Sequence, residues 1–122
     1  MEQLAPHRAL TYMVIKDIRD EQHLFRESHR HMEYLMKLGF QGHAGYIDEG
    51  QRGKGWEMLE KHLEHSKGNI ELVLVSDFEQ LSGDVGWVLL KQAELEDKYG
   101  VTIHSLRENQ LGVDKEQGLS FR

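Results

Sequence analysis

The sequence predicts an α/β domain, a three-layer sandwich built around a mostly parallel sheet. Short apolar runs rich in β-branched residues alternate with amphipathic segments of helical period, and the connections between them are short. A chain of 122 residues is long enough for one domain with a real core and too short for two ordinary ones. We therefore expect a single domain over residues 1–122, with right-handed crossovers between its strands and a C-terminal tail over residues 110–122.

The first part of the chain predicts two strands with a helix between them. Residues 9–15 form a short apolar run bounded by charged residues, which is typical of a buried strand. Residues 20–38 have the period of an amphipathic helix that ends at Gly39, and residues 44–47 predict a second, brief strand. The residues expected on the inner face of this helix are Leu24, Phe25, Ser28, Met32, Leu35 and Met36.

The middle of the chain predicts a loop, a short helix and the central strand. Residues 50–55 hold three glycines and two cations, which is typical of an exposed loop that can face a ligand. Residues 56–65 predict a helix with a narrow apolar stripe. Residues 70–75 are almost continuously apolar, as a strand covered on both faces would be, so we place this strand in the middle of the sheet.

The last part of the chain predicts a loop, a helix and a fourth strand. The loop covers residues 76–83, and Asp84 is a good N-cap for a helix that runs to Tyr99, with Gly100 after its last residue. Residues 101–106 predict the fourth strand. The helix residues expected to point inward are Val85, Val88, Leu89, Leu95 and Tyr99.

Trp87 and Leu90 lie on the opposite face of that helix and are candidates for a surface that binds a protein partner. The competing interpretation is that residues 111–121 fold back over them. Because ligands collect beyond the carboxyl ends of parallel strands, we expect residues 16–17, 48–55 and 76–83 to meet at one edge of the sheet.

Composition and charge exclude several classes of protein. Fifteen Lys and Arg against 21 Asp and Glu give a formal net charge of −6, which disfavours binding of nucleic acid by bulk electrostatics. The chain has no cysteine, which excludes a disulfide scaffold, a thiolate metal site and a cysteine nucleophile. It shows no targeting segment and no membrane-spanning run, so we expect a cytoplasmic protein. We also expect that the protein uses no cofactor.

Four short motifs stand along residues 10–109 in an order and spacing that resemble the N-terminal catalytic domain of serine recombinases, the resolvase and invertase family. The resemblance implies a resolvase-like, flavodoxin-like sheet. The motifs are Tyr12-Met13-Val14-Ile15-Lys16, then Tyr46-Ile47-Asp48-Glu49-Gly50 followed by Lys54-Gly55-Trp56, then Phe78-Glu79-Gln80-Leu81-Ser82-Gly83-Asp84, and last Ser105-Leu106-Arg107-Glu108.

The chain departs from this family at the positions that carry its chemistry. The family attacks a DNA phosphodiester with a serine hydroxyl, and several arginines neutralise the charge that develops on phosphorus. Carried over position by position, the resemblance puts Lys16 in place of the nucleophile and Val14 in place of the first-strand arginine. The Asp-Arg pair of the third motif and the later arginine correspond to Glu79, Gln80 and Gly83.

These departures predict a catalytically inactive recombinase-like domain, a pseudoenzyme linked to DNA recombination or its regulation. It would act through protein contacts, by homodimerising or by pairing with an active recombinase or with a DNA-bound complex. The family's domain continues into a long dimer-forming helix and a DNA-binding domain. Residues 110–118 hold two glycines and no sustained apolar period, so we do not expect that helix here, and we expect direct binding of nucleic acid to be weak or absent.

The alternative is a small-ligand or phosphotransfer module that depends on a metal or on phosphate. Asp17, Asp48 and Asp77 could converge at the strand ends around a divalent metal, although helix caps and turns are the interpretation we favour. Lys16, Arg52 and Lys54 are candidates for a cationic pocket that binds phosphate or sulfate, and a solvated loop explains them as well.

His23, Glu27 and His31 are spaced four apart along one helix, a geometry that can hold a metal on successive turns. Because this flank of the helix is expected to be solvated, we favour surface histidines and predict no metal site.

Overall fold

Four parallel strands form the sheet, in the order β2-β1-β3-β4. The computed structural model describes residues 7–66 and 68–107. The strands are β1 (His7–Ile15), β2 (Phe40–Glu49), β3 (Leu72–Val75) and β4 (Thr102–Ser105). The predicted parallel sheet is confirmed, and β3 lies inside it between β1 and β4. The predicted tail over residues 110–122 lies outside the described residues.

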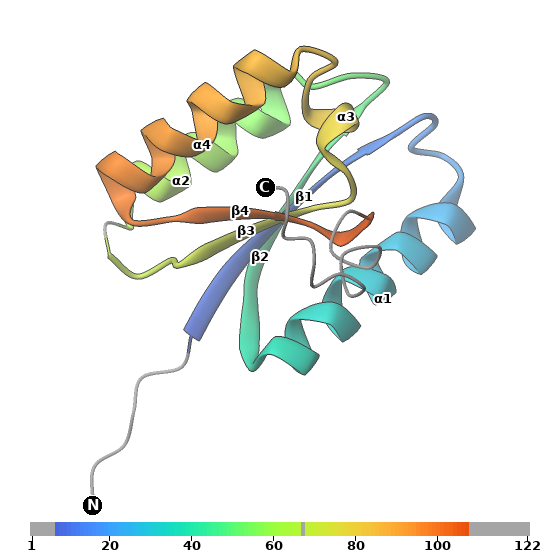
Figure 1. The fold of residues 1–122 in the computed structure, drawn as a ribbon. Coiled ribbons are helices and arrows are strands. Elements are labelled where there is room, and N and C mark those ends of the chain that lie inside the picture. Colours follow the sequence, from blue (N-terminus) through green and yellow to red (C-terminus); the bar gives the residue numbers. More distant parts are fainter. Residues whose placement is uncertain (1–6, 67, 108–122) are drawn as a thin grey trace, which may run out of the picture.

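Helices cover the sheet on both faces, which gives the predicted three layers. They are α1 (Glu21–Leu38), α2 (Lys54–His65), the short α3 (Phe78–Leu81) and α4 (Val85–Tyr99). The chain steps from β1 to β2 in one direction and then returns past β1 to β3 and β4. Because crossovers are right-handed, this reversal puts α1 on one face and both α2 and α4 on the other (Figure 1).

The alternation of side chains along the inner strands divides the core into two clusters. On β1, Leu10 and Tyr12 point toward α2 and α4, while Ala9 points toward α1. The larger cluster consists of Leu10, Tyr12, Trp56, Leu59, Leu63, Ile70, Val73, Val75, Leu81, Leu95, Val101 and Ile103. The smaller cluster, on the side of α1, consists of Ala9, Leu35, Leu72, Leu74 and Leu106.

Capping residues fix the ends of the two longest helices, and three of them, Gly39, Asp84 and Gly100, were predicted from the sequence. Asp20 accepts a hydrogen bond from the backbone N–H of His23, and Asp84 accepts from the N–H groups at the start of α4. Gly39 and Gly100 follow the two helices in the left-handed conformation that glycine adopts without strain. In the part of the chain that the structure describes, no helix is both long enough and apolar enough to cross a membrane.

The second strand is longer than predicted. It covers ten residues rather than residues 44–47, because it begins directly after Gly39 and pairs with β1 along its whole length. The pairing of the two strands shifts at one point, where Ala9 and Leu10 of β1 pair with Gly42 and Ala44 of β2. His43 is therefore the extra residue of a bulge in β2. The alternation of apolar and polar residues that predicts a strand is weak over residues 40–49, because β2 is an edge strand with many half-exposed side chains.

The predicted loop over residues 76–83 contains the short helix α3. Asp77 caps it by accepting a hydrogen bond from the N–H of Gln80 at 2.9 Å, and Leu81 packs into the core. A single turn carries too little apolar period to be recognised in a sequence. The bounds of the last two strands are also narrower than the predicted 70–75 and 101–106.

The inward face of α4 is rotated from the predicted one. Val88 and Leu95 are buried as expected, but Val85 and Leu89 are 70% and 63% exposed. Trp87, predicted on the outer face, is half-buried and packs against the core, with its ring centroid 6.4 Å from that of Trp56. Burying the large indole removes more apolar area from water than burying Val85 would, which explains the rotation.

The inward face of α1 is also different from the predicted one. Leu35 is buried as expected, whereas Phe25 and Met36 are 71% and 74% exposed. His31, expected on a solvated flank, is fully buried. The hydrophobic pattern of this helix therefore marks two faces, one packed on the sheet and one exposed.

Candidate functional site

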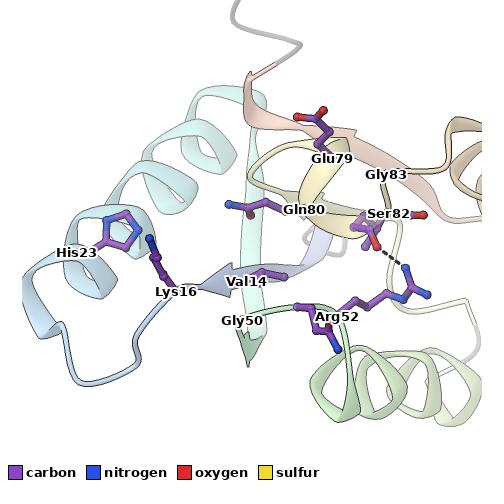
Figure 2. A pocket seen from close by; sticks show the side chains of 11 residues that line it. Val14, Lys16, His23, Gly50, Arg52, Glu79, Gln80, Ser82 and Gly83 are labelled. Carbon is purple, nitrogen blue, oxygen red and sulfur yellow. Dashed lines mark hydrogen bonds between the residues drawn. The ribbon is translucent and has the colours of Figure 1, made fainter.

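A pocket of about 760 Å³ lies at the carboxyl ends of the strands, where the order of the sheet reverses. Three consecutive strand-to-helix connections contribute to it, at Lys16, at Gly50 to Arg52, and at Glu79 to Gly83. Lys16 lies on one side of the pocket beside His23 of α1, and Arg52 lies on the other side (Figure 2). The predicted convergence of these segments at one edge of the sheet therefore occurs.

All five positions at which the chain departs from the recombinase motifs line this one pocket. They are Val14, Lys16, Glu79, Gln80 and Gly83. A serine is also present, but the hydroxyl of Ser82 accepts a hydrogen bond from the N–H of Asp84 at 3.0 Å. Ser82 belongs to the third motif, whereas the resemblance puts the family's nucleophile at Lys16, directly after the first strand.

Among the described residues Arg52 is the one arginine that lines the pocket, and its side chain is already engaged. Its guanidinium donates to the backbone carbonyl of Leu81 at the end of α3. The same group lies 3.9 Å from the centroid of the Trp87 ring, a cation–π contact. Arg52 therefore joins the loop after β2 to α3 and α4, and holds the wall of the pocket in place.

Asp48 organises the loop from β2 to α2. Its carboxylate accepts hydrogen bonds from the Tyr12 hydroxyl at 2.6 Å and from the N–H groups of Gly53, Gly55 and Trp56 at 2.7, 2.7 and 3.0 Å. A Cβ at Gly55 would lie 2.5 Å from the carbonyl oxygen of Ile47, so this close approach requires glycine. The carboxylate caps the N-terminus of α2, where the helix dipole favours a negative charge.

These contacts shift the pKa values of Asp48 and Tyr12. Burial alone would raise the pKa of Asp48, but the hydrogen bonds from Tyr12 and from the three N–H groups outweigh it and hold that pKa below its ordinary value. Burial, together with the bond to the Asp48 carboxylate, raises the pKa of the Tyr12 phenol far above its ordinary value. Asp48 is therefore charged and Tyr12 neutral at neutral pH.

The three aspartates proposed as metal ligands have separate structural roles. Asp17 pairs with Arg19 at 3.1 Å, Asp48 caps α2, and Asp77 caps α3. The described part of the chain contains no group of three side chains placed to hold a metal ion. In the structure Asp48 and Asp77 accept hydrogen bonds at the starts of helices, and Asp17 lies in a turn.

The three cations proposed to bind phosphate do not all line the pocket. Lys16 and Arg52 line the pocket, whereas Lys54, the exposed first residue of α2, is not among its lining residues. Since Arg52 is held by Leu81 and Trp87, the structure does not bring three free cations together.

His31 forms a buried contact that the sequence did not predict. Its Nε2 lies 2.9 Å from the hydroxyl of Ser76, which follows β3, and that hydroxyl donates to Glu27 at 3.3 Å. His31 Nδ1 has no hydrogen-bond partner within residues 7–66 and 68–107. Burial lowers the pKa of His31 to about 4; the charge of Glu27 raises that pKa by a smaller amount, and the charge of Arg30 lowers it further. His23 instead lines the pocket, and the expectation that His31 is a surface histidine is wrong because its side chain is buried.

Solved structures share this architecture. A resolvase family site-specific recombinase from Streptococcus pneumoniae matches with a TM-score of 0.69 and 18% identity, over 84% of this chain and 73% of its own. The N-terminal catalytic domain of TP901-1 integrase matches with a TM-score of 0.68 and 21% identity, over 83% of this chain and 79% of its own.

The C-terminal catalytic domain of ISC1926 TnpA, an IS607-like serine recombinase, matches with a TM-score of 0.66 and 20% identity, over 92% of this chain and 80% of its own. No protein-family model and no curated protein sequence matches the chain. The parallel sheet of order β2-β1-β3-β4 and these three similarities together show that the chain has the fold of serine recombinase catalytic domains.

Proposed function

We propose that this resolvase-like domain does not cleave DNA and acts through protein contacts, in recombination or its regulation. The observation that carries the proposal is the composition of the pocket. The five positions that correspond to the family's nucleophile and charged groups lie around one cavity, and they hold an amine, an isopropyl group, a carboxylate, an amide and a glycine.

Phosphoryl transfer in this pocket would lack its electrostatic support. Removing one contact that stabilises the charge of a transition state typically costs about two to three powers of ten in rate. Val14, Gln80 and Gly83, which stand where the family has arginines, carry no charge, and Glu79 only keeps the carboxylate of the family's Asp. These losses together leave no route to strand cleavage by the family mechanism.

The face of α4 next to the pocket supports the protein-binding part of the proposal. Val85, Leu89 and Leu90 are all exposed, Leu90 by 74%. Val85 and Leu89 line a groove of about 460 Å³ between α3 and α4, together with Arg107. Exposed apolar side chains next to a groove are typical of a surface that binds a protein. Of the two predicted interface residues, Leu90 is available on this surface, while Trp87 packs inward.

Affinity capture with matched variants tests this surface. We expect the wild-type domain to retain a protein from its native cells that the variant Leu89→Glu/Leu90→Glu does not retain, because two carboxylates prevent burial of the α4 face. Met58→Glu is the matched control, since Met58 is 57% exposed on α2. Equal retention by all three proteins, or retention of no specific protein by the wild type, would contradict the proposal.

A further inference from the structure

Three aromatic rings meet where α2 packs beside the edge strand β2, outside the pocket at the carboxyl ends of the strands. The hydroxyl of Tyr46 on β2 lies 2.7 Å from Nδ1 of His62 on α2. The rings of His43, also on β2, and His62 have centroids 5.3 Å apart and planes inclined by 74°. Two imidazole rings from different elements therefore lie next to each other.

The bulge in β2 brings His43 to this face of the sheet. Gly42 faces α1, since a Cβ there would lie 2.8 Å from the Met32 methyl group, and Ala44 packs against the core cluster on the side of α2. His43, the extra residue between them, turns toward α2 as well, as its contact with His62 shows. Bulges redirect side chains in this way and are frequent next to functional sites.

The bond to Tyr46 orients the His62 ring so that its other nitrogen can bind a ligand. A tyrosine hydroxyl can donate or accept, so this bond persists when Nδ1 carries the proton and Nε2 presents its lone pair. Histidines that bind metals usually have their second ring nitrogen held by a neighbouring group in this way. Burial and the neighbouring His43 and His65 lower the pKa of His62, which keeps its ring in the neutral form that a metal requires.

We infer that His43 and His62 bind one divalent transition-metal ion, such as Zn²⁺, which joins β2 to α2. The described part of the chain holds no group of three side chains placed to bind a metal, so these two histidines supply the protein ligands and water occupies the other positions. The inference is independent of the function proposed above, because the site uses neither the pocket nor the exposed face of α4.

The spacing of the two rings fits a shared ion. With Zn–N distances of about 2.0–2.1 Å and a tetrahedral angle at the metal, two imidazole rings have centroids about 5 Å apart. The observed separation is 5.3 Å, and His43 is exposed, so its ring can turn a nitrogen toward the ion at little cost. Imidazole suits Zn²⁺ and Cu²⁺, whereas Mg²⁺ prefers oxygen ligands. The site should therefore bind Zn²⁺, bind Cu²⁺ more tightly and not bind Mg²⁺.

Titration of the protein, free of any histidine tag, with zinc chloride at neutral pH tests the inference. Isothermal titration calorimetry over micromolar to millimolar concentrations should show one Zn²⁺ per chain at the tightest site. We expect His43→Gln and His62→Gln each to weaken this binding at least about tenfold, since removing even a group that orients a ligand has an effect of that size. Zn²⁺ should also raise the urea midpoint of the wild type and not those of the two variants, because the ion binds the folded state.

Histidine variants at other exposed positions are the matched controls. His65→Gln, next to the site on α2, and His29→Gln, on α1, should bind Zn²⁺ as tightly as the wild type, since the His65 Nδ1–H donates to the carbonyl of Lys61 at 2.8 Å. No binding by the wild type up to millimolar Zn²⁺ would overturn the inference, as would equal binding by the wild type and His43→Gln. Loss of binding in His65→Gln with none in His43→Gln would overturn it too, by placing the ion on α2 alone.

Discussion

Replacing Asp48 by alanine is expected to destabilise the domain by about 3 kcal/mol. The change removes a carboxylate that accepts hydrogen bonds from Tyr12 and from three N–H groups of the loop and first turn of α2. Hydrogen bonds to a charged group contribute about 1.5–3 kcal/mol each, and loss of a cap costs about 0.5–2 kcal/mol. Part of the loss is recovered, because water can reach the exposed residues of this loop.

Urea denaturation at pH 7 measures this effect, with Asp97→Ala on the exposed side of α4 as the control that should stay within about 0.5 kcal/mol of wild type. Because the pKa of Asp48 is lowered in the folded state, its contribution is present above its ordinary pKa of 3.8 and is lost as the pH falls below that value. An unchanged midpoint in Asp48→Ala would show that the loop is not held by this carboxylate.

The second large effect is a loss of stability in mild acid caused by His31. Its pKa is lowered from 6.5 to about 4 by burial, so the unfolded chain takes up a proton at a pH where the folded chain does not. Stability due to His31 is therefore complete above pH 6.5 and falls as the pH drops toward 4. The expected loss over this window is about 3 kcal/mol.

Denaturation of His31→Gln as a function of pH tests this effect. The variant should be less stable at pH 7 but should show a flatter profile between pH 6.5 and 4, whereas His65→Gln, at an exposed position, should keep the wild-type slope. Burial also lowers the pKa of His104, so some slope remains in the variant. Identical slopes for wild type and His31→Gln would mean that His31 is not buried as a neutral ring.

The architecture was predictable because strong local signals agree with the tertiary structure. Asp20 and Gly39 bound α1, Asp84 and Gly100 bound α4, and the continuous apolar run before residue 76 belongs to an inner strand. The errors lie where tertiary contacts decide the outcome. The rotation of α4 depends on a contact between Trp87 and Trp56, and the length of β2 depends on its pairing with β1.

The sequence was enough to predict which segments meet at the site. It was not enough to predict the contacts that each side chain makes there. Parallel strands bring their carboxyl ends to one edge, so Lys16, Gln80 and Gly83 could be placed around one cavity from their positions in the motifs. The engagement of Arg52 by Trp87 and Leu81 could not be predicted, because those residues are more than 25 positions away along the chain. The burial of His31 could be suspected only from its spacing to Leu35.

A cleavage assay tests the central claim, that the residues of the pocket cannot support phosphoryl transfer. Supercoiled plasmid is incubated with the wild type, with Lys16→Ala and with Lys16→Ser, and both nicked circles and covalent protein–DNA products are measured beside an active serine recombinase. We predict no product above background for any of the three proteins, because even a serine at position 16 would lack the arginines that the reaction requires. Nicking by the wild type that is lost in Lys16→Ala would contradict the claim.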